Sequence, residues 1–373
     1  MAEFIPPFSL ARQATTLGPE VAAAVERVLA SGRYVQGPEC AAFESEVAAA
    51  ELGGPPLAAV TCSSGTDALH LALRAAGVRA GDVVLTTAFS FFATAGAILL
   101  AGAQPQFVDI DPATFNLDPV ALRAALARKP SARIAAILPV HLYGRVADMP
   151  TILAIAEERE IPVVEDAAQA LGSTLDARPA GAWGAAASFS FYPTKNLGAM
   201  GEGGLVTTRD PAILDRLRLL RAHGSRQRYQ HETMGWNGRM HELQAAILRA
   251  KLPHLRTWID QRRHVAAQYE LGLRDLKTVV LPEPVPGHGF HQYVIRVPNR
   301  DAVRQTLLEH QIGTEVYYPI PLHQQPALRA YAASTPLTES ERACREVLAL
   351  PMYPELAPAE IERVVSALHA CCR

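Results

Sequence analysis

The sequence has few cysteines and no C-x-x-C pair. Among its 373 residues there are 5 cysteines, an odd number, so the chain lacks the pattern of a disulfide framework or of a structural zinc site. We therefore expect no metal site and a reducing, cytoplasmic location.

Excess charge and long apolar runs are also missing. The 35 lysine and arginine residues nearly balance the 37 aspartate and glutamate residues, and the formal net charge is −2. Such a chain has no overall attraction to nucleic acid or to an anionic membrane surface. The most apolar run, residues 91–103, is too short to cross a bilayer. We expect small-molecule substrates, with no nucleic acid and no membrane as partners.

Two glycine-rich nucleotide fingerprints are absent as well. The chain contains no G-x-x-x-x-G-K-[ST], and no G-x-G-x-x-G follows its first apolar run. A P-loop nucleotidase or a Rossmann dinucleotide site would carry one of these patterns. Both protein classes are therefore disfavoured.

The first 210 residues do contain a regular alternation of short apolar runs and helical patterns. The predicted strands are 57–62, 82–87, 104–110, 134–140, 162–166, 188–192 and 204–208, and predicted helices 66–76, 94–101, 119–127 and 149–159 lie between them. This rhythm predicts an α/β fold with a mostly parallel central sheet covered on both faces. Residues 19–50 read as two further helices.

The pattern changes towards the C-terminus. A helical stretch at 240–269, interrupted at Pro253, is followed by a predicted strand at 291–297, helix at 302–310, strand at 313–318 and helix at 358–369. We predict a large α/β domain over 1–250, including the N-terminal helices, and a smaller α+β domain over 251–373. The polar stretch 225–233 has no core pattern, which predicts a mobile or partner-covered loop.

Polar residues follow several strands, where ligands of open α/β sheets bind. Ser64, Gly65 and Thr66 open the helix after the first strand, so they either hold a phosphate or cap that helix. Asp166 ends an apolar run, where its charge needs a partner. It could bind magnesium, cap a helix or pair with a protonated pyridine nitrogen.

Lysine is rare, at positions 129, 195, 251 and 277 only. Lys195 follows a strand in a glycine-rich segment with few charges, where burial would lower its pKa and make it a nucleophile for a carbonyl. The alternative is a surface lysine on a glycine-rich loop. Phe91 could stack on a flat ring or simply pack in the core. Pyridoxal 5'-phosphate (PLP) requires all of these features together: a site for its phosphate, an acid for its ring nitrogen, a lysine for its aldehyde and an aromatic side chain against its ring.

Six motifs in order carry a resemblance to a known family. They read SGTDAL at 64–69, FSFFAT at 89–94, VEDAAQ at 164–169, SFSFYPTKNLG at 188–198, GWNGRMHELQ at 235–244 and YYPIPLH at 317–323, with GRYVQG at 32–37 near the start. Over nearly its whole length the chain resembles the DegT/StrS family of sugar-nucleotide aminotransferases.

The resemblance implies PLP fold type I, as in aspartate aminotransferase, and a homodimer with shared active sites. Lys195 matches the lysine that binds the cofactor aldehyde, and Asp166 matches the partner of the pyridine nitrogen. The other cofactor contacts implied by the motifs are Ser64, Gly65, Thr66, Phe91, Gln169, Ser190 and, from the neighbouring subunit, Asn237. The amino donor would be L-glutamate and the acceptor a keto sugar on a nucleotide diphosphate.

The late motif resembles that of enzymes that aminate carbon 3, of the UDP-3-keto-N-acetylglucosaminuronate or dTDP-3-keto-6-deoxyhexose type, in polysaccharide or antibiotic biosynthesis. Tyr317 departs from the first histidine of that motif, and Ala88 from a common proline, so amination at carbon 4 stays an alternative. The expected substrate contacts are Arg33, Tyr34, His223, Arg239, Tyr317, Tyr318 and His323.

Cations are needed to bind a diphosphate or a uronate. Arg226 and Arg228, in the polar stretch, are either such ligands or solvated surface residues. Two rival functions are a PLP-dependent sugar dehydratase, whose members carry histidine where Lys195 stands, and a non-catalytic regulatory or binding relative.

Overall fold

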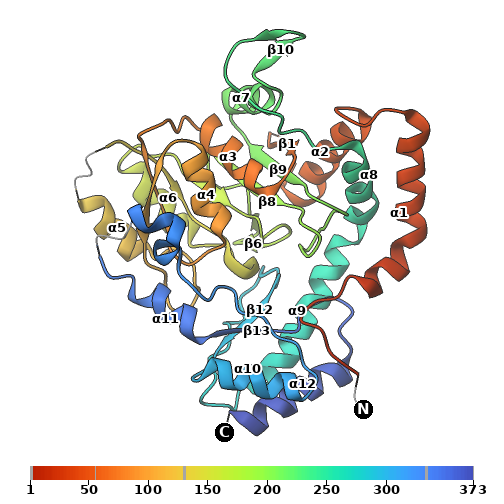
Figure 1. The fold of residues 1–373 in the computed structure, drawn as a ribbon, viewed down its shortest axis with the longest axis vertical. Coiled ribbons are helices and arrows are strands. Elements are labelled where there is room, and N and C mark those ends of the chain that lie inside the picture. The colour runs from red at the N-terminus through yellow and green to blue at the C-terminus, as the bar shows by residue number, and fades with distance from the viewer. Residues whose placement is uncertain (1–2, 55, 129–131, 332–334, 373) are drawn as a thin grey trace.

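A computed structural model describes residues 3–54, 56–128, 132–331 and 335–372, so Lys129 lies outside the described residues. The central feature is a mixed sheet (Figure 1) in the order β3-β2-β4-β5-β8-β9-β1, in which parallel bridges Ile137–Val163 and Val140–Asp166 join its two parts. The strands are β1 Ala58–Cys62, β2 Val83–Thr87, β3 Gln104–Val108, β4 Ile134–Leu138, β5 Val164–Asp166, β8 Ala186–Ser190 and β9 Gly204–Thr208. All seven predicted strands are confirmed.

β9 is the exception to the parallel order, since it runs antiparallel to both β1 and β8. Successive residues of the strands belong to different core clusters: Val164 and Ala186 pack on one face, Val163 and Ala187 on the other. This alternation is the pleat of a sheet buried on both sides. The predicted two-sided covering is confirmed.

Helices form both covering layers. They are α1 Ala11–Ser31, α2 Pro38–Glu51, α3 Gly65–Ala75, α4 Phe92–Leu100, α5 Pro119–Ala127, α6 Met149–Glu157, α7 Pro211–Arg221 and α8 Glu242–Lys251. Three of them start after an aspartate, because Asp118, Asp148 and Asp210 each accept a hydrogen bond from a free N–H of the first turn. A proline in the first turn of each supports the same start.

The C-terminal part has its own core (Figure 1, bottom). Its elements are α9 Leu255–Leu273, β12 Tyr293–Arg296, α10 Arg300–Glu309, α11 Thr338–Glu346, β13 Val347–Leu350 and α12 Pro358–Cys371. The predicted break at Pro253 is confirmed, since a short 3-10 turn, Leu252–His254, separates α8 from α9. Ile5 also packs in this core, and the boundary at residue 250 stays a prediction.

One predicted strand was wrong, and one strand was missed. Residues 313–318 do not form a strand: among the described residues only Glu315 makes a single bridge, to Ala349, because the chain then turns towards the large sheet, where Tyr143 donates to the carbonyl of Tyr317. β13, which was not predicted, pairs with β12 instead. The stretch 225–233 is exposed from residue 226 onwards, as expected of a segment without a core pattern, and within it β10 Ser225–Gln227 and β11 Gln230–His231 form a hairpin that projects beside α7 (Figure 1, top). Its mobility or cover by a partner stays a prediction.

Minor elements complete the description. β6 Thr174–Leu175 and β7 Arg178–Pro179 form a small antiparallel pair before β8. No helix within the described ranges is long and apolar enough to span a lipid bilayer.

Candidate active site

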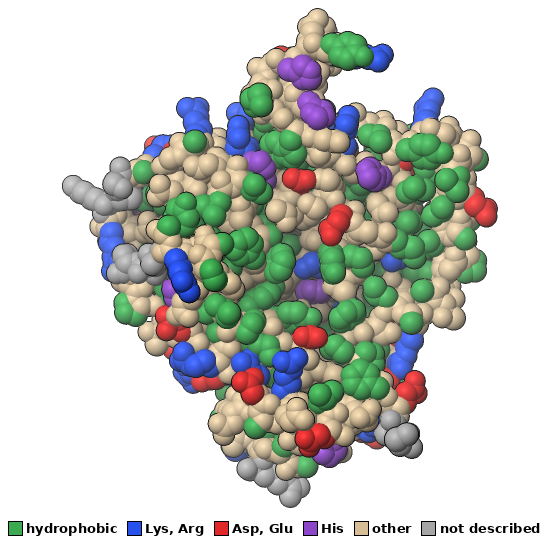
Figure 2. All heavy atoms as spheres, viewed as in Figure 1, with side chains coloured by type: hydrophobic (Ala, Val, Ile, Leu, Met, Phe, Trp, Pro, Cys, Tyr) green, Lys and Arg blue, Asp and Glu red, His purple; other side chains and the backbone are tan. Residues whose placement is uncertain are grey.

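The site lies where the ends of β1, β5 and β8 meet the start of β9. Asp166 is the last residue of β5 and Ser190 the last of β8, while Ser64 follows β1. Since β9 runs in reverse, its first residue, Gly204, pairs with Ser190 on one side and Cys62 on the other. Figure 2 shows hydrophobic side chains gathered over the centre of the face drawn there.

The start of α3 forms a tight cradle with β8 and β9. Ser64 caps α3, since its Oγ accepts from the N–H of Asp67 at 3.1 Å. A Cβ on Gly65 would lie 2.6 Å from the Cβ of Ser190 and 2.8 Å from its Oγ. A Cβ on Gly204 would lie 2.2 Å from the carbonyl oxygen of Ser64. The helix N-terminus and these hydroxyls are therefore brought together only because both positions are glycine, and the arrangement suits a phosphate.

Replacing Gly65 with alanine should weaken PLP binding at least tenfold, which corresponds to about 1.4 kcal/mol. The added methyl would overlap Ser190 and push apart the two elements of the cradle. An absorbance titration with PLP measures the effect. Gly18→Ala is the matched control, because a Cβ there meets nothing within 4 Å inside α1. Equal PLP affinities in both variants and the wild type would contradict a phosphate role for this cradle.

Asp166 is buried at the end of β5. Its Oδ2 accepts from Thr94 Oγ1 at 2.8 Å, and its Oδ1 accepts from the N–H of Ala168 at 3.2 Å. Burial raises the pKa of this carboxyl, while the two hydrogen bonds and the charge of Lys195 act in the opposite direction. A cationic partner would offset the free-energy cost of burying the Asp166 charge that these interactions leave.

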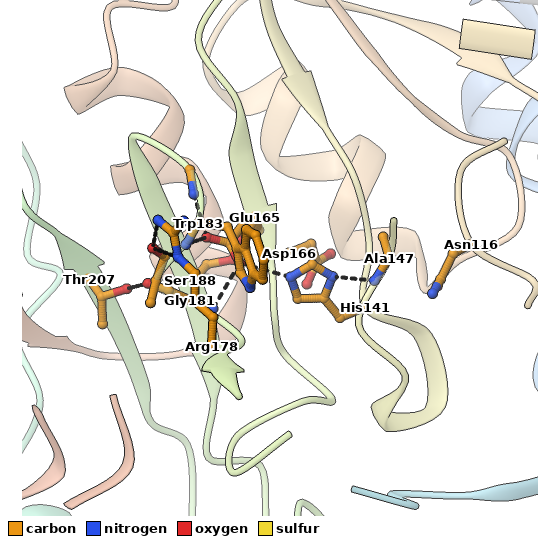
Figure 3. Close-up of polar contacts among 12 residues, drawn as sticks. Asn116, His141, Ala147, Glu165, Asp166, Arg178, Gly181, Trp183, Ser188 and Thr207 are labelled. Atoms are coloured by element: carbon orange, nitrogen blue, oxygen red, sulfur yellow. Dashed lines mark hydrogen bonds and ion pairs between the residues drawn. The ribbon is translucent and has the colours of Figure 1, made fainter. Parts of the chain in front are cut away.

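The neighbouring Glu165 points to the other side of β5 and is fully buried in a separate network (Figure 3). Its oxygens accept from His141 Nε2 at 2.9 Å and from the N–H groups of Gly181, Trp183 and Gly184 at 2.7–2.8 Å. Burial alone would raise the pKa of Glu165, but these donors hold it below its ordinary value. Since His141 Nδ1 accepts from the N–H of Ala147, Nε2 carries the hydrogen.

Lys195 follows β8 in a turn in which its N–H donates to the carbonyl of Tyr192 at 2.8 Å. Desolvation of the amine lowers the pKa of Lys195 to about 8, although the charge of Asp166 acts to raise it. Lys195 and Asp166 are therefore near enough for the charge of each to affect the pKa of the other. At neutral pH a larger share of the amine is neutral, and so nucleophilic, than for a lysine in water.

This pKa predicts a pH profile. In the cofactor-free protein, the rate of reaction of Lys195 with the PLP aldehyde should rise with pH up to about 8 and level off above it, because only the neutral amine attacks. Stopped-flow absorbance at a series of pH values measures this rate. A rate that keeps rising to pH 10 would mean an ordinary, solvated amine.

Gln169 links the sheet edge to the C-terminal part. Its Oε1 accepts from the N–H of Tyr143 at 2.7 Å, and its Nε2 donates to the hydroxyl of Tyr318 at 3.1 Å. Tyr143 in turn donates to the carbonyl of Tyr317. Burial raises the pKa of the Tyr318 hydroxyl, which therefore stays protonated. The predicted residues Gln169, Tyr317 and Tyr318 are brought together here.

Phe91 lies at the rim. It precedes α4, it is 58% exposed, and its ring centre is 6.2 Å from that of Tyr318. An exposed aromatic face beside Tyr318 is available to a flat ring and is not needed in the core.

The remaining predicted residues are dispersed. Arg33 and Tyr34 are exposed on the loop between α1 and α2, and Arg239 lines a cavity of about 110 Å3 with Gln36 and Gly37 from the end of that loop. Asn237 is exposed, and its Oδ1 accepts from Arg239 Nε at 2.9 Å. Thr66 lies in the first turn of α3.

Two predicted histidines lie apart from this group. His223 is exposed beside the β10–β11 hairpin, where its carbonyl accepts from His231. His323 pairs with Glu341 at 3.2 Å in the C-terminal part. The suggested anion ligand Arg226 is already paired with Asp215 and Glu232, and Arg228 lies over the ring of Tyr229.

Sequence reasoning missed Thr94, Tyr143 and Ser90. Ser90 Oγ lies 2.8 Å from Thr94 Oγ1, so it supports the hydroxyl that donates to Asp166. Both belong to the motif at 89–94, in which attention to hydroxyl spacing at i and i+4 could have found them. Tyr143 has a positive φ of 59°, which is uncommon for tyrosine and has no sequence signal.

Three comparisons bear on this geometry. A model of the DegT/DnrJ/EryC1/StrS aminotransferase family matches residues 15–369. A pleiotropic regulatory protein of Geobacillus stearothermophilus is 46% identical, covering 98% of this chain and 97% of that protein. A UDP-N-acetyl-3-dehydro-alpha-D-glucosamine 3-aminotransferase of Acidithiobacillus ferrooxidans is 42% identical, covering 98% and 97%. The X-ray structure of S. venezuelae DesV in complex with a ketimine intermediate has a TM-score of 0.94 at 40% identity, covering 100% of this chain and 99% of that one.

Proposed function

Because the chain belongs to the DegT/DnrJ/EryC1/StrS aminotransferase family, we propose that it transfers an amino group from L-glutamate to carbon 3 of a keto sugar on a nucleotide diphosphate. The family and the aminotransferase class confirm the resemblance found in the sequence, and the fold shared with DesV confirms fold type I. The observation that carries the proposal is that the buried Lys195 amine and the buried Asp166 carboxylate follow or end neighbouring strands of one sheet edge, where the charge of each affects the pKa of the other.

The residues present fit PLP. The glycine-dependent cradle of Ser64, Gly65 and Ser190 suits its phosphate, and the buried Asp166 carboxylate, whose pKa burial raises, would be stabilised in its charged form by a protonated pyridine nitrogen. Thr66 and Gln169 would also contact it, with Phe91 against its ring. When bound, PLP supplies an aldehyde and a ring that withdraws electrons from the reacting carbon.

The chain's own residues then have separate tasks. Asp166, held by Thr94, would face the pyridine nitrogen of PLP with a carboxylate and so favour the protonated form of that nitrogen. Lys195 Nζ removes the proton from the α-carbon of glutamate and later returns a proton on the way to the amino sugar. Tyr318, fixed by Gln169, orients the bound molecules from the C-terminal side.

The sugar and nucleotide are supported by relatives. The Acidithiobacillus protein is named for a UDP-linked sugar and for carbon 3, and a transaminase of Streptomyces venezuelae, equally identical at 42%, is named for a dTDP-linked 3-amino sugar, so the relatives favour carbon 3 over carbon 4 and support both nucleotides. Arg33, Tyr34, His223, Arg239, Tyr317 and His323 stay proposed substrate contacts.

We also propose a homodimer in which Asn237 serves the partner's cofactor. Exposed large apolar side chains, among them Tyr34, Phe91, Phe92, Tyr192, Met200 and Met234, support a protein partner. The five cysteines are free thiols, which supports a cytoplasmic location.

A second candidate is a regulatory role without catalysis. It is favoured by the name of the Geobacillus relative, a pleiotropic regulatory protein. The retention of Lys195, Asp166 and Gln169 in one site speaks for catalysis instead.

Assay with a panel of UDP- and dTDP-linked 3-keto and 4-keto sugars separates these possibilities. The PLP-loaded protein is mixed with glutamate and each sugar, and products are analysed by mass spectrometry. We expect 2-oxoglutarate and a 3-amino sugar. Nitrogen at carbon 4 only would overturn the preferred position, and no 2-oxoglutarate even in a single turnover would favour the regulatory role.

A further inference from the structure

His291 is a buried histidine beside the Lys195 turn that the proposed mechanism leaves without a task. The residue is 7% exposed, and its Nδ1 is buried without a hydrogen-bond partner among the described residues. Buried polar atoms of this kind are rare and call for an explanation. The charge of Lys195 contributes to lowering the pKa of His291, after burial, so the imidazole is neutral.

The backbone around His291 is held on several sides. Arg262 donates to the carbonyl oxygens of Phe290 and His291 at 3.3 and 3.2 Å. Asn196, next to Lys195, donates to the carbonyl of Gly289 at 3.0 Å. A Cβ on Gly144 would lie 2.9 Å from the backbone nitrogen of His291, so the two backbone segments pass close to each other. The backbone at His291 is therefore fixed from several sides, although the buried Nδ1 of its ring has no hydrogen-bond partner among the described residues.

His291 also lines a small cavity that has both polar and apolar walls. The cavity has a volume of about 30 Å3, and its polar lining is Thr194, His291, Gln292, Glu315 and Tyr317. That is room for one water molecule. Gln292 Oε1 is a second buried acceptor without a partner among the described residues. Thr194 places the cavity one residue away from Lys195 along the chain.

We propose that His291 relays protons between the Lys195 amine and water in this cavity. The inference rests on the proposed function, because the amine gains and loses a proton in each half of the transamination. One ring nitrogen accepts a proton from the Lys195 ammonium while the other releases its own to the cavity water. The ring is neutral before and after, so no buried imidazolium is needed.

The experiment compares two fates of one hydrogen. PLP-loaded wild type and His291→Phe are mixed in ordinary water with L-glutamate deuterated at the α-carbon, for a single turnover. Mass spectrometry of the pyridoxamine 5'-phosphate formed gives the ratio of retained to exchanged label. We expect the ratio to rise at least threefold in His291→Phe, because the amine exchanges more slowly with water. An unchanged ratio overturns the proposal.

Controls separate a proton path from disturbed packing. His288 is also buried, in the same segment, but its Nδ1 accepts from the N–H of Phe290 at 3.0 Å. His288→Phe should leave the ratio unchanged, and an equal rise there would overturn the proposal. His291→Leu provides a second variant, with the same expected rise, if the phenylalanine variant does not fold. Failure of the wild type to convert glutamate would count against the proposed function itself.

Discussion

Lys195→Ala is expected to lose the visible absorbance band that PLP gives with the wild type and to slow transamination by about 10⁴-fold or more. The large effect follows because one amine both binds the aldehyde and moves the proton, and a positioned acid–base group alone contributes about 10²–10⁴-fold. Absorbance spectra with PLP, followed by a glutamate half-reaction, measure both losses.

The other described lysines provide the controls. Lys277 is exposed, so Lys277→Ala should keep the band and the rate. Lys251 is buried, but its Nζ donates to the carbonyl of Gly198 at 2.8 Å, which gives it a structural role near the same turn. A band that survives in Lys195→Ala and disappears in Lys251→Ala would show that the wrong lysine has been assigned.

Asp166→Asn should lower the transamination rate by about 10³-fold and yet raise the Tm of the cofactor-free protein at pH 7. The rate falls because an amide cannot keep the pyridine nitrogen protonated. The Tm rises because burial raises the folded-state pKa of Asp166 above its unfolded value, so the charged carboxylate penalises the fold at all pH values above both. Differential scanning calorimetry at pH 7 and assays with glutamate measure the two effects.

Glu165→Gln is the matched control on the same strand, and its stability effect should have the opposite sign. The folded-state pKa of Glu165 is lowered, so its carboxylate stabilises the fold above its unfolded pKa, and this stabilisation is lost only as the pH falls through the folded value. The amide NH2 of glutamine would face backbone N–H groups that need acceptors. This should lower the free energy of unfolding by about 3 kcal/mol. A lower Tm in both variants would mean that hydrogen bonds and nearby charges already offset the cost of burying the Asp166 charge in the cofactor-free protein.

The sheet was predictable from sequence because strands buried on both faces are short apolar runs separated by helical patterns. β13 was not, because Val347 follows α11 directly without a turn residue, and its partner β12 lies some fifty positions earlier. The apolar pattern at 313–318 was misleading, since its tyrosines pack towards the large sheet and not beside a strand.

The sequence pointed to candidate site residues where they end a strand or follow it closely, as Asp166, Ser64 and Lys195 do. Residues that reach the site through tertiary contact carried no such signal. Tyr143 depends on a left-handed turn, and His291 depends on a segment held by Arg262 from a distant helix. The roles assigned to these residues stay predictions until variants are tested.

The reversed direction of β9 has a consequence for biosynthesis on the ribosome. Among the strands of the described residues, β1 pairs with β9 alone, and β9 is completed about 150 residues later. While the chain is being made, the first strand and the turn after it must wait for that late segment before they can be fixed. The nascent protein should thus become able to capture its cofactor only after Thr208 has left the exit tunnel, whatever has already folded ahead of it.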